Sequence, residues 1–116
     1  MVFKDRLEFF TEENCYVLEL SNSAADEEVS IARIRVEAHK TTSWHRLKNT
    51  TERYLILSGH GLLELENHDP VKVFPNSVSI IPASHAQRIT NLTDEDLIFF
   101  AICSPRFVQK NYERLE

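Results

Sequence analysis

Long apolar runs are absent from this 116-residue sequence. No stretch approaches the roughly 20 consecutive apolar residues that a helix needs to cross a bilayer. The first ten residues, MVFKDRLEFF, contain no apolar stretch followed by a small-residue cleavage site. We therefore expect neither a membrane-spanning nor a secreted protein, and expect the chain to be cytoplasmic.

Clustered positive charge is absent as well. The chain has 13 Lys and Arg against 18 Asp and Glu, and its basic residues are scattered rather than grouped into a stripe. A protein that follows a phosphate backbone needs such a stripe. The formal net charge of −5 and this scatter exclude nucleic acid as an expected partner.

Cysteine is scarce, with only two residues in the chain. Cys15 and Cys103 lie far apart, outside any CxxC spacing, and each belongs to an apolar run. A thiol in such a run usually packs as a small hydrophobic group. The spacing does not indicate a disulfide.

Short β-branched or aromatic runs, separated by polar breaks, recur from Cys15 onward. Hydrophobic residues make up 42% and charged residues 27%, which is typical of a globular protein, and the length fits a single domain spanning 1–116. Many short strands at close spacing predict an all-β sandwich or barrel. The expected strands cover 15–20, 29–37, 43–47, 52–58, 61–66, 71–74, 77–81, 86–91 and 97–103.

Two segments outside these strands are expected to be helical. Residues 4–10 (KDRLEFF) predict a single turn. Residues 106–116 (RFVQKNYERLE) follow a proline and predict a short C-terminal helix. One stripe of that helix would carry Phe107, Tyr112 and Leu115.

The segment from Ser43 to Asn91 resembles the two signature blocks of the cupin superfamily. The first block of that family reads G-x5-H-x-H-x3,4-E-x6-G, and the second reads G-x5-P-x-G-x2-H-x3-N. The first block falls on His45, Leu47, Glu52 and Gly59, and the second on Asn76, Pro82, Ser84, Gln87 and Asn91. The resemblance is to the small single-domain conserved-barrel (cupin type 2) proteins, and it implies a double-stranded β-helix, or jelly-roll barrel.

Two departures from the blocks affect the site. Leu47 stands where the family has its second histidine, and Gln87 stands where it has its third. The resemblance implies that His45, Glu52 and Gln87 converge in the barrel mouth and hold a divalent transition metal (Mn, Fe, Ni or Zn). The open alternative is a metal-free site, in which His45 is a buried histidine hydrogen-bonded to Glu52.

Strand parity adds neighbours to this set. Residues two apart on a strand share a face, so Tyr54 would point with Glu52, and His85 with Gln87. His85 could supply a further ligand, as could His60 if its strand continues through Gly59. His60 is otherwise expected to be a surface residue at a strand end.

The resemblance implies a metal-dependent small-molecule enzyme of the isomerase, dioxygenase or decarboxylase class, acting on a sugar or keto acid. Tyr54 would act as proton donor and His85 as acid or base. The alternative is a non-catalytic binding module, in which His45, Gln87 and Tyr54 hold a small polar metabolite by hydrogen bonds. The two missing histidines favour this alternative.

Arg33 and Arg35 share one face of their strand. In the first interpretation they lie on a solvated sheet face and pair with acidic side chains such as Glu19, Glu64 and Glu66. In the second interpretation both guanidinium groups enter the pocket and hold a carboxylate or phosphate, whose oxygens they match.

The last strand, 97–103, is apolar on both faces. A strand buried on both faces in so small a domain suggests that one side meets a partner subunit. A two-fold homodimer is the commonest such arrangement. We therefore expect a homodimer.

Overall fold

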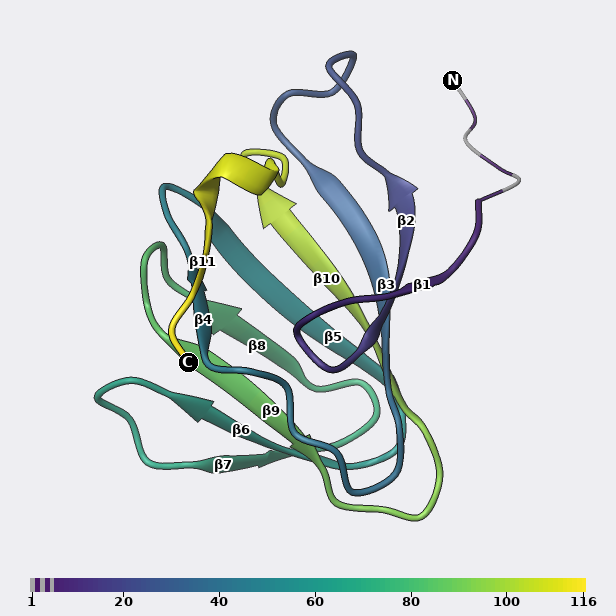
Figure 1. The fold of residues 1–116 in the computed structure, drawn as a ribbon, viewed down its shortest axis with the longest axis vertical. Coiled ribbons are helices and arrows are strands. Elements are labelled where there is room, and N and C mark those ends of the chain that lie inside the picture. The colour runs from purple at the N-terminus through teal and green to yellow at the C-terminus, as the bar shows by residue number, and fades with distance from the viewer. Residues whose placement is uncertain (1, 3, 5) are drawn as a thin grey trace.

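Two antiparallel sheets face each other in the computed structural model, which describes residues 2, 4 and 6–116 (Figure 1). The strand order of one sheet is β1-β2-β3-β10-β5-β8, and its members are Phe9–Phe10 (β1), Tyr16–Ser21 (β2), Ser30–Val36 (β3), Leu97–Ser104 (β10), Thr51–Ser58 (β5) and Val78–Ile81 (β8). The order of the other is β11-β4-β9-β6-β7, and its members are Tyr112–Arg114 (β11), His45–Leu47 (β4), Gln87–Asn91 (β9), Gly61–Leu65 (β6) and Val71–Val73 (β7). The predicted all-β double-stranded β-helix is confirmed.

Every strand expected from the sequence is present, with its ends shifted by no more than two residues. Alternate residues of the central strands are buried, as period-2 patterning requires. The apolar residues of these inner faces meet between the sheets and form the core. Its most deeply buried members include Val36, Ile56, Ile89, Leu97 and Phe99.

The glycine positions of the two signature blocks share an unusual backbone conformation. Gly59 has φ 86°, and the non-glycine residues Asn76 and Ser84 have φ 73° and 67°. Asparagine tolerates this left-handed region better than most residues, whereas serine does so at some cost. The turns therefore keep the geometry of the blocks even where the glycine itself is missing.

The predicted C-terminal helix is wrong. Residues Gln109–Asn111 form only a 3-10 turn, and Tyr112–Arg114 form strand β11, which pairs antiparallel with β4. Without β11, the three-residue strand β4 would leave one edge of its sheet unpaired. Pairing these backbone groups outweighs the helical periodicity of the segment.

The helical turn expected at residues 4–10 is also wrong for the part that can be compared. Phe9–Phe10 form strand β1, which pairs with β2 at the opposite edge of the six-stranded sheet. Residue 5 of that segment lies outside the described residues. Across the described chain, no helix is long and apolar enough to span a membrane.

Candidate functional site

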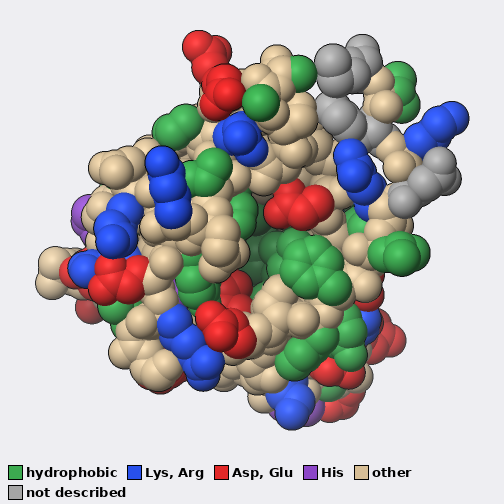
Figure 2. Space-filling model, turned by 45° about the horizontal axis from the view of Figure 1, so that its top comes forward, with side chains coloured by type: hydrophobic (Ala, Val, Ile, Leu, Met, Phe, Trp, Pro, Cys, Tyr) green, Lys and Arg blue, Asp and Glu red, His purple; other side chains and the backbone are tan. Residues whose placement is uncertain are grey.

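A cavity of about 160 Å³ lies against the inner face of the six-stranded sheet. Its walls come from strands of both sheets and from the segments that flank them, near residues 9–13 and 107–112. Figure 2 shows the hollow from outside, with hydrophobic side chains within it and acidic side chains around it. Strands and the segments that flank them therefore both contribute to the wall of this solvent-facing space.

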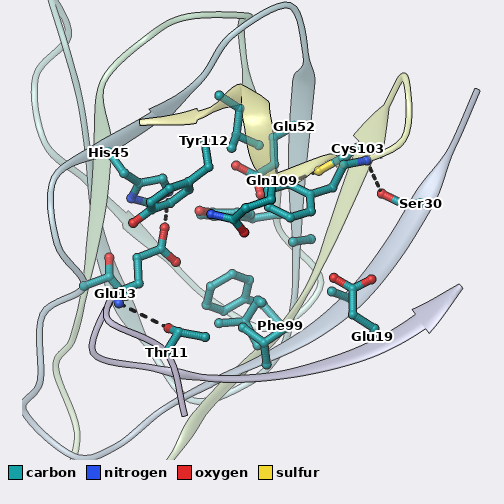
Figure 3. Close-up of a pocket in the computed structure, with 18 of the residues that line it drawn as sticks. Thr11, Glu13, Glu19, Ser30, His45, Glu52, Phe99, Cys103, Gln109 and Tyr112 are labelled. Carbon is teal, nitrogen blue, oxygen red and sulfur yellow. Dashed lines mark hydrogen bonds and ion pairs between the residues drawn. The ribbon is translucent and has the colours of Figure 1, made fainter. Parts of the chain in front are cut away.

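His45 lies at one side of this cavity, on β4, and is only 3% exposed. Its Nδ1 lies 2.7 Å from the carbonyl oxygen of Ser43, and its Nε2 lies 2.8 Å from Oε1 of Glu13 (Figure 3). The ring of Tyr112 stacks on the imidazole with 5.6 Å between ring centroids. These contacts fix the plane of the ring and the direction of both its nitrogens.

Opposing effects act on the pKa of His45. Burial lowers the pKa, but the hydrogen bond to Glu13 and the charges of Glu13 and Glu52 raise it more, with a further contribution from the Ser43 carbonyl. The net result is a pKa of about 9. His45 is therefore a protonated imidazolium at neutral pH, held by a carboxylate.

Glu13 is held in place by its own backbone. Its carbonyl oxygen accepts a hydrogen bond from the Ser43 amide at 3.0 Å, and its amide donates to Oγ1 of Thr11 at 3.2 Å. Both bonds tie the loop between β1 and β2 to the edge of the cavity. The Glu13 carboxylate thus reaches His45 from a loop that lies 32 residues earlier in the chain.

Glu52 and Gln87 form a second buried pair. Gln87 lies opposite His45 in the β4–β9 register, and its Nε2 donates to Oε1 of Glu52 at 2.7 Å. The structure therefore brings His45, Glu52 and Gln87 together, although Gln87 lies behind Glu52 rather than in the cavity lining. Burial raises the pKa of Glu52 to about 7, against the opposing charge of His45 and the Gln87 hydrogen bond.

Tyr54 lines the cavity two residues beyond Glu52 on β5. Its ring contacts Phe99, with 4.4 Å between centroids. Burial holds the pKa of the Tyr54 phenol well above its usual range, so the hydroxyl is a neutral donor and acceptor. A phenol with a raised pKa gives up its proton less readily, so this state suits a hydrogen-bond partner better than the proton donor predicted from the sequence.

The thiols near the cavity are not activated. Burial raises the pKa of Cys15 to about 12 and raises that of Cys103 further. Cys103 lines the cavity and its Sγ lies 3.8 Å from Oε2 of Glu52. Because a thiolate is the reactive form, neither cysteine is a nucleophile at neutral pH.

The remaining histidines of interest lie elsewhere. His85 is outside the cavity lining, in the turn before β9, and its Nδ1 faces the carbonyl oxygen of Ala83 at 3.2 Å. Parity fails to carry it inward because Ser84, with its positive φ, places it in a turn rather than on the strand. His60 is exposed and its ring contacts Phe74.

Arg33 and Arg35 do not enter the cavity. Arg35 pairs with Glu8 at 2.7 Å and with Asp96 at 3.3 Å, and Arg33 lies 3.7 Å from Glu8. The two arginines therefore belong to the outer face of the sheet, with Glu8 in the place of the acids that the sequence suggested.

Two cavity residues were missed by reasoning from the sequence alone. Glu13 lies in the TEEN loop between β1 and β2, and Tyr112 lies in the segment expected to be helical. The left-handed Asn14 at φ 68° is the one local signal of a tight hairpin there. Neither residue belongs to a signature block, so the blocks could not reveal them.

The donor atoms do not fit a divalent transition metal in this arrangement. Both nitrogens of His45 face acceptors, a carbonyl and a carboxylate oxygen, so both donate and neither offers a lone pair. Leu47 supplies no donor where the family's second histidine would be. Among the described residues, no group of three or more His, Cys, Asp or Glu side chains is placed to hold a metal ion.

Comparison with known proteins gives likeness in structure only. No family model and no curated protein matches the sequence. Oxalate decarboxylase from Bacillus subtilis matches with a TM-score of 0.84 and 15% identity, over 99% of this chain and 31% of that one. Pac13, a nucleoside dehydratase from Streptomyces, matches with a TM-score of 0.82 and 13% identity, over 100% of this chain and 92% of that one.

KdgF from a Halomonas species matches with a TM-score of 0.79 and 13% identity, over 92% of this chain and 96% of that one. A Klebsiella pneumoniae protein with a double-stranded β-helix domain matches with a TM-score of 0.77 and 10% identity, over 91% and 88%. Nearly the whole chain is covered in each case. The protein has the cupin fold, as the signature blocks predicted, and small-molecule enzymes are among the proteins that share it.

The pKa of His45 provides a test of the Glu13 contact. We expect Glu13→Gln to lower that pKa by more than about one unit, because it removes the largest contributions that raise it. Titration of the histidine ring protons by NMR measures the change. Glu12→Gln, which removes the neighbouring charge but not the hydrogen bond, is the control and should shift the pKa much less.

Stability should follow the same contact. A pKa raised from 6.5 to about 9 contributes stability that is complete below pH 6.5 and is lost as the pH rises through 9. At about 1.4 kcal/mol per unit, the contribution is at most roughly 3 to 4 kcal/mol. Denaturant unfolding of Glu13→Gln should show a smaller loss of stability across this range, and an unchanged pH profile would contradict the assignment.

Proposed function

We propose that this protein is an enzyme that moves protons on a small polar metabolite with its own side chains, without a resident metal. One observation carries the proposal: the His45–Glu13 and Glu52–Gln87 pairs meet at one cavity and differ in protonation. A protonated group that can donate a proton and a carboxyl group that can accept one, both facing one cavity, are the pattern of an acid and a base in one site. The raised pKa of Glu52, about 7, suits general-base work near neutral pH.

The reaction class that fits is dehydration or isomerisation beside a carbonyl group. Ionised Glu52 would take a proton from the carbon next to the carbonyl, and the C–H electron pair would form a double bond. In a dehydration, Nε2–H of His45 would exchange its hydrogen bond with Glu13 for one to the hydroxyl on the following carbon, and that hydroxyl would leave with the Nε2 proton, as water. Proton return from Glu52 to His45 through solvent would restore both groups.

Isomerisation would use the same two groups differently. Glu52 would remove the same proton, while His45 would protonate the carbonyl oxygen and give a neutral enediol. Glu52 would then return its proton to the former carbonyl carbon, and the other hydroxyl would lose its proton to His45, which gives the isomeric carbonyl compound and restores both groups. Tyr54 would hydrogen-bond a substrate hydroxyl beside them. Pac13, which shares the fold, is a nucleoside dehydratase and has been solved with uridine, which supports both the class of reaction and a small polar ligand.

Loss of turnover in two variants tests the enzyme. His45→Gln and Glu52→Gln should each lower kcat by roughly 10²- to 10⁴-fold with a smaller change in KM, because each removes one proton-transfer group. The measurement is ¹H NMR in D₂O, following loss of the proton beside the carbonyl for a panel of hydroxy aldehydes and ketones. The matched controls are His39→Gln and Glu95→Gln, both exposed and outside the lining.

A binding module would give another result in that experiment. Wild-type protein would bind members of the panel without turnover, and the variants would only weaken binding. That outcome would refute the enzyme and support the alternative considered from the sequence, a metal-free binding module.

Metal content tests the other part of the proposal. After purification without metal-chelating resin, elemental analysis should find far less than one transition metal per chain, because His45 offers no lone pair. Turnover should also survive a chelator. One tightly held Mn, Fe, Ni or Zn per chain, with activity that depends on it, would instead support the metal-dependent enzyme and the ligands His45, Glu52 and Gln87.

We also propose the homodimer suggested by the last strand, formed through the outer face of the six-stranded sheet. Phe100 of β10 is only half-buried there, and Val78 and Ile80 of the edge strand β8 are 59% and 62% exposed. A second copy would cover this apolar surface. We expect a dimer by sedimentation velocity and dissociation in Ile80→Lys, but not in the control Val71→Lys on the other sheet; a wild-type monomer would refute the dimer.

A further inference from the structure

The titratable side chains of the cavity lining carry an uneven charge. Four of them are carboxyl groups, and the lining formed by the described residues includes no lysine or arginine. The positive charge of His45 faces the carboxylate of one of the four at 2.8 Å. The carboxyl groups are those of Glu12, Glu13, Glu19 and Glu52.

Arginines outside the lining do not reverse this balance. Arg33 and Arg35 are engaged by Glu8 on the outer face of the sheet. Arg114 lies 4.0 Å from Glu12 at an exposed position. Burial raises the pKa of Glu19, against a hydrogen bond with Asn22 and the charge of Arg6. None of these four guanidinium groups lines the cavity, so none is placed to hold an anion inside it.

Unsatisfied polar atoms point to the same kind of ligand. Among the described residues, Oε2 of Glu19 and the hydroxyl of Tyr112 are buried and have no hydrogen-bond partner. A carboxylate oxygen accepts hydrogen bonds and cannot donate them. A ligand hydroxyl can satisfy such an acceptor, whereas a phosphate or carboxylate brings only further acceptors.

Glu19 also lies away from the reacting groups. Figure 3 shows Glu19 on the opposite side of the cavity from the His45–Glu13 pair, with the ring of Phe99 between them. A bound molecule would therefore meet the acid–base groups at one end and an acceptor at the other. Aromatic and aliphatic walls between the two ends suit the ring of a sugar or a base.

We propose that the cavity selects uncharged, hydroxyl-bearing molecules, such as unphosphorylated sugars or nucleosides, and rejects their phosphorylated and carboxylated forms. The inference rests on the proposed function in taking this cavity as the substrate site. Physically, a cleft lined by charge of one sign between walls of low polarity focuses the field and depletes ions of that sign. Of the substrates expected from the sequence, sugars fit this selection and keto acids do not.

The reactivity of Cys103 toward probes of different charge measures the electrostatic field inside the cavity, and this test does not require the substrate to be known. It lines the cavity, and in a Cys15→Ala background it is the one thiol left in the chain. The probes are methyl methanethiosulfonate, which is neutral, and its sulfonatoethyl analogue, which is an anion. Each rate is measured at mildly alkaline pH and divided by the rate of the same reagent with free cysteine.

We expect the normalised rate of the anionic reagent to be at least about tenfold below that of the neutral one. The double variant Glu12→Gln, Glu19→Gln should raise the anionic rate several-fold relative to the neutral rate; the loss of the Glu19 charge also lowers the pKa of Cys103, which speeds both reagents alike. Glu28→Gln with Glu95→Gln makes the same change in net charge at exposed positions outside the lining, and should alter neither rate. Raising the salt concentration should narrow the difference, since screening weakens the field.

The raised pKa of Cys103 slows both reactions alike, so only the ratio of the two rates is diagnostic. Equal normalised rates for the two reagents would overturn the inference, as would a higher normalised rate for the anionic one. Equal rates would leave the acid–base mechanism standing, because that mechanism is tested by the turnover of the His45 and Glu52 variants. Faster turnover of a phosphorylated compound than of its unphosphorylated form would also overturn the charge selection and leave the acid–base mechanism standing. Conversely, charge selection at Cys103 without any turnover would support a selective binding site and refute the proposal of an enzyme.

Discussion

The ion pair between His45 and Glu13 is the contact on which the arrangement of the cavity depends. An imidazole buried to this degree would normally be neutral, since burial alone favours the uncharged form. A carboxylate at 2.8 Å and a backbone carbonyl on the other nitrogen reverse that preference. The same contact draws the loop between β1 and β2 onto strand β4, so one interaction fixes both the charge of the ring and the position of a cavity wall.

The positive charge of His45 also affects the buried carboxyl group of Glu52. Glu52 lies deep in the barrel, where a carboxyl group would be strongly disfavoured as an anion, yet the positive ring and the Gln87 amide moderate that effect. Two buried oxygen atoms nearby have no hydrogen-bond partner, Oε2 of Glu19 and Oε1 of Gln87, and both are acceptors. Acid–base chemistry and a preference for ligands that donate hydrogen bonds are thus two results of one charge distribution.

Much of the fold could be predicted because short-range sequence patterns determine most of its strands. Alternation along 52–58 and 86–91 indicates which side chains face inward. Fixed spacing places His45 and Gln87 on the paired strands β4 and β9, and Glu52 on β5 of the facing sheet. The two ends of the chain could not be predicted in this way. Residues 112–114 have helical periodicity and become a strand because β4 needs a partner, and Glu13 meets its histidine through the closing of a hairpin that no local pattern specifies. His85 failed for a related reason, since parity holds only along a strand and Ser84 turns the chain just before β9 begins.

The cavity takes part of its wall from each end of the described chain, through Phe9 to Glu13 on one side and Phe107 to Tyr112 on the other. An affinity tag or fusion partner placed next to either of these two stretches would therefore start close to the opening. Such additions could compete with ligands for the mouth or pull the hairpin away from β4. Tagged protein used for binding or kinetic work is best compared with cleaved, tag-free protein. Reporters are better inserted in the NHDP loop at 67–70, which lies outside the cavity lining.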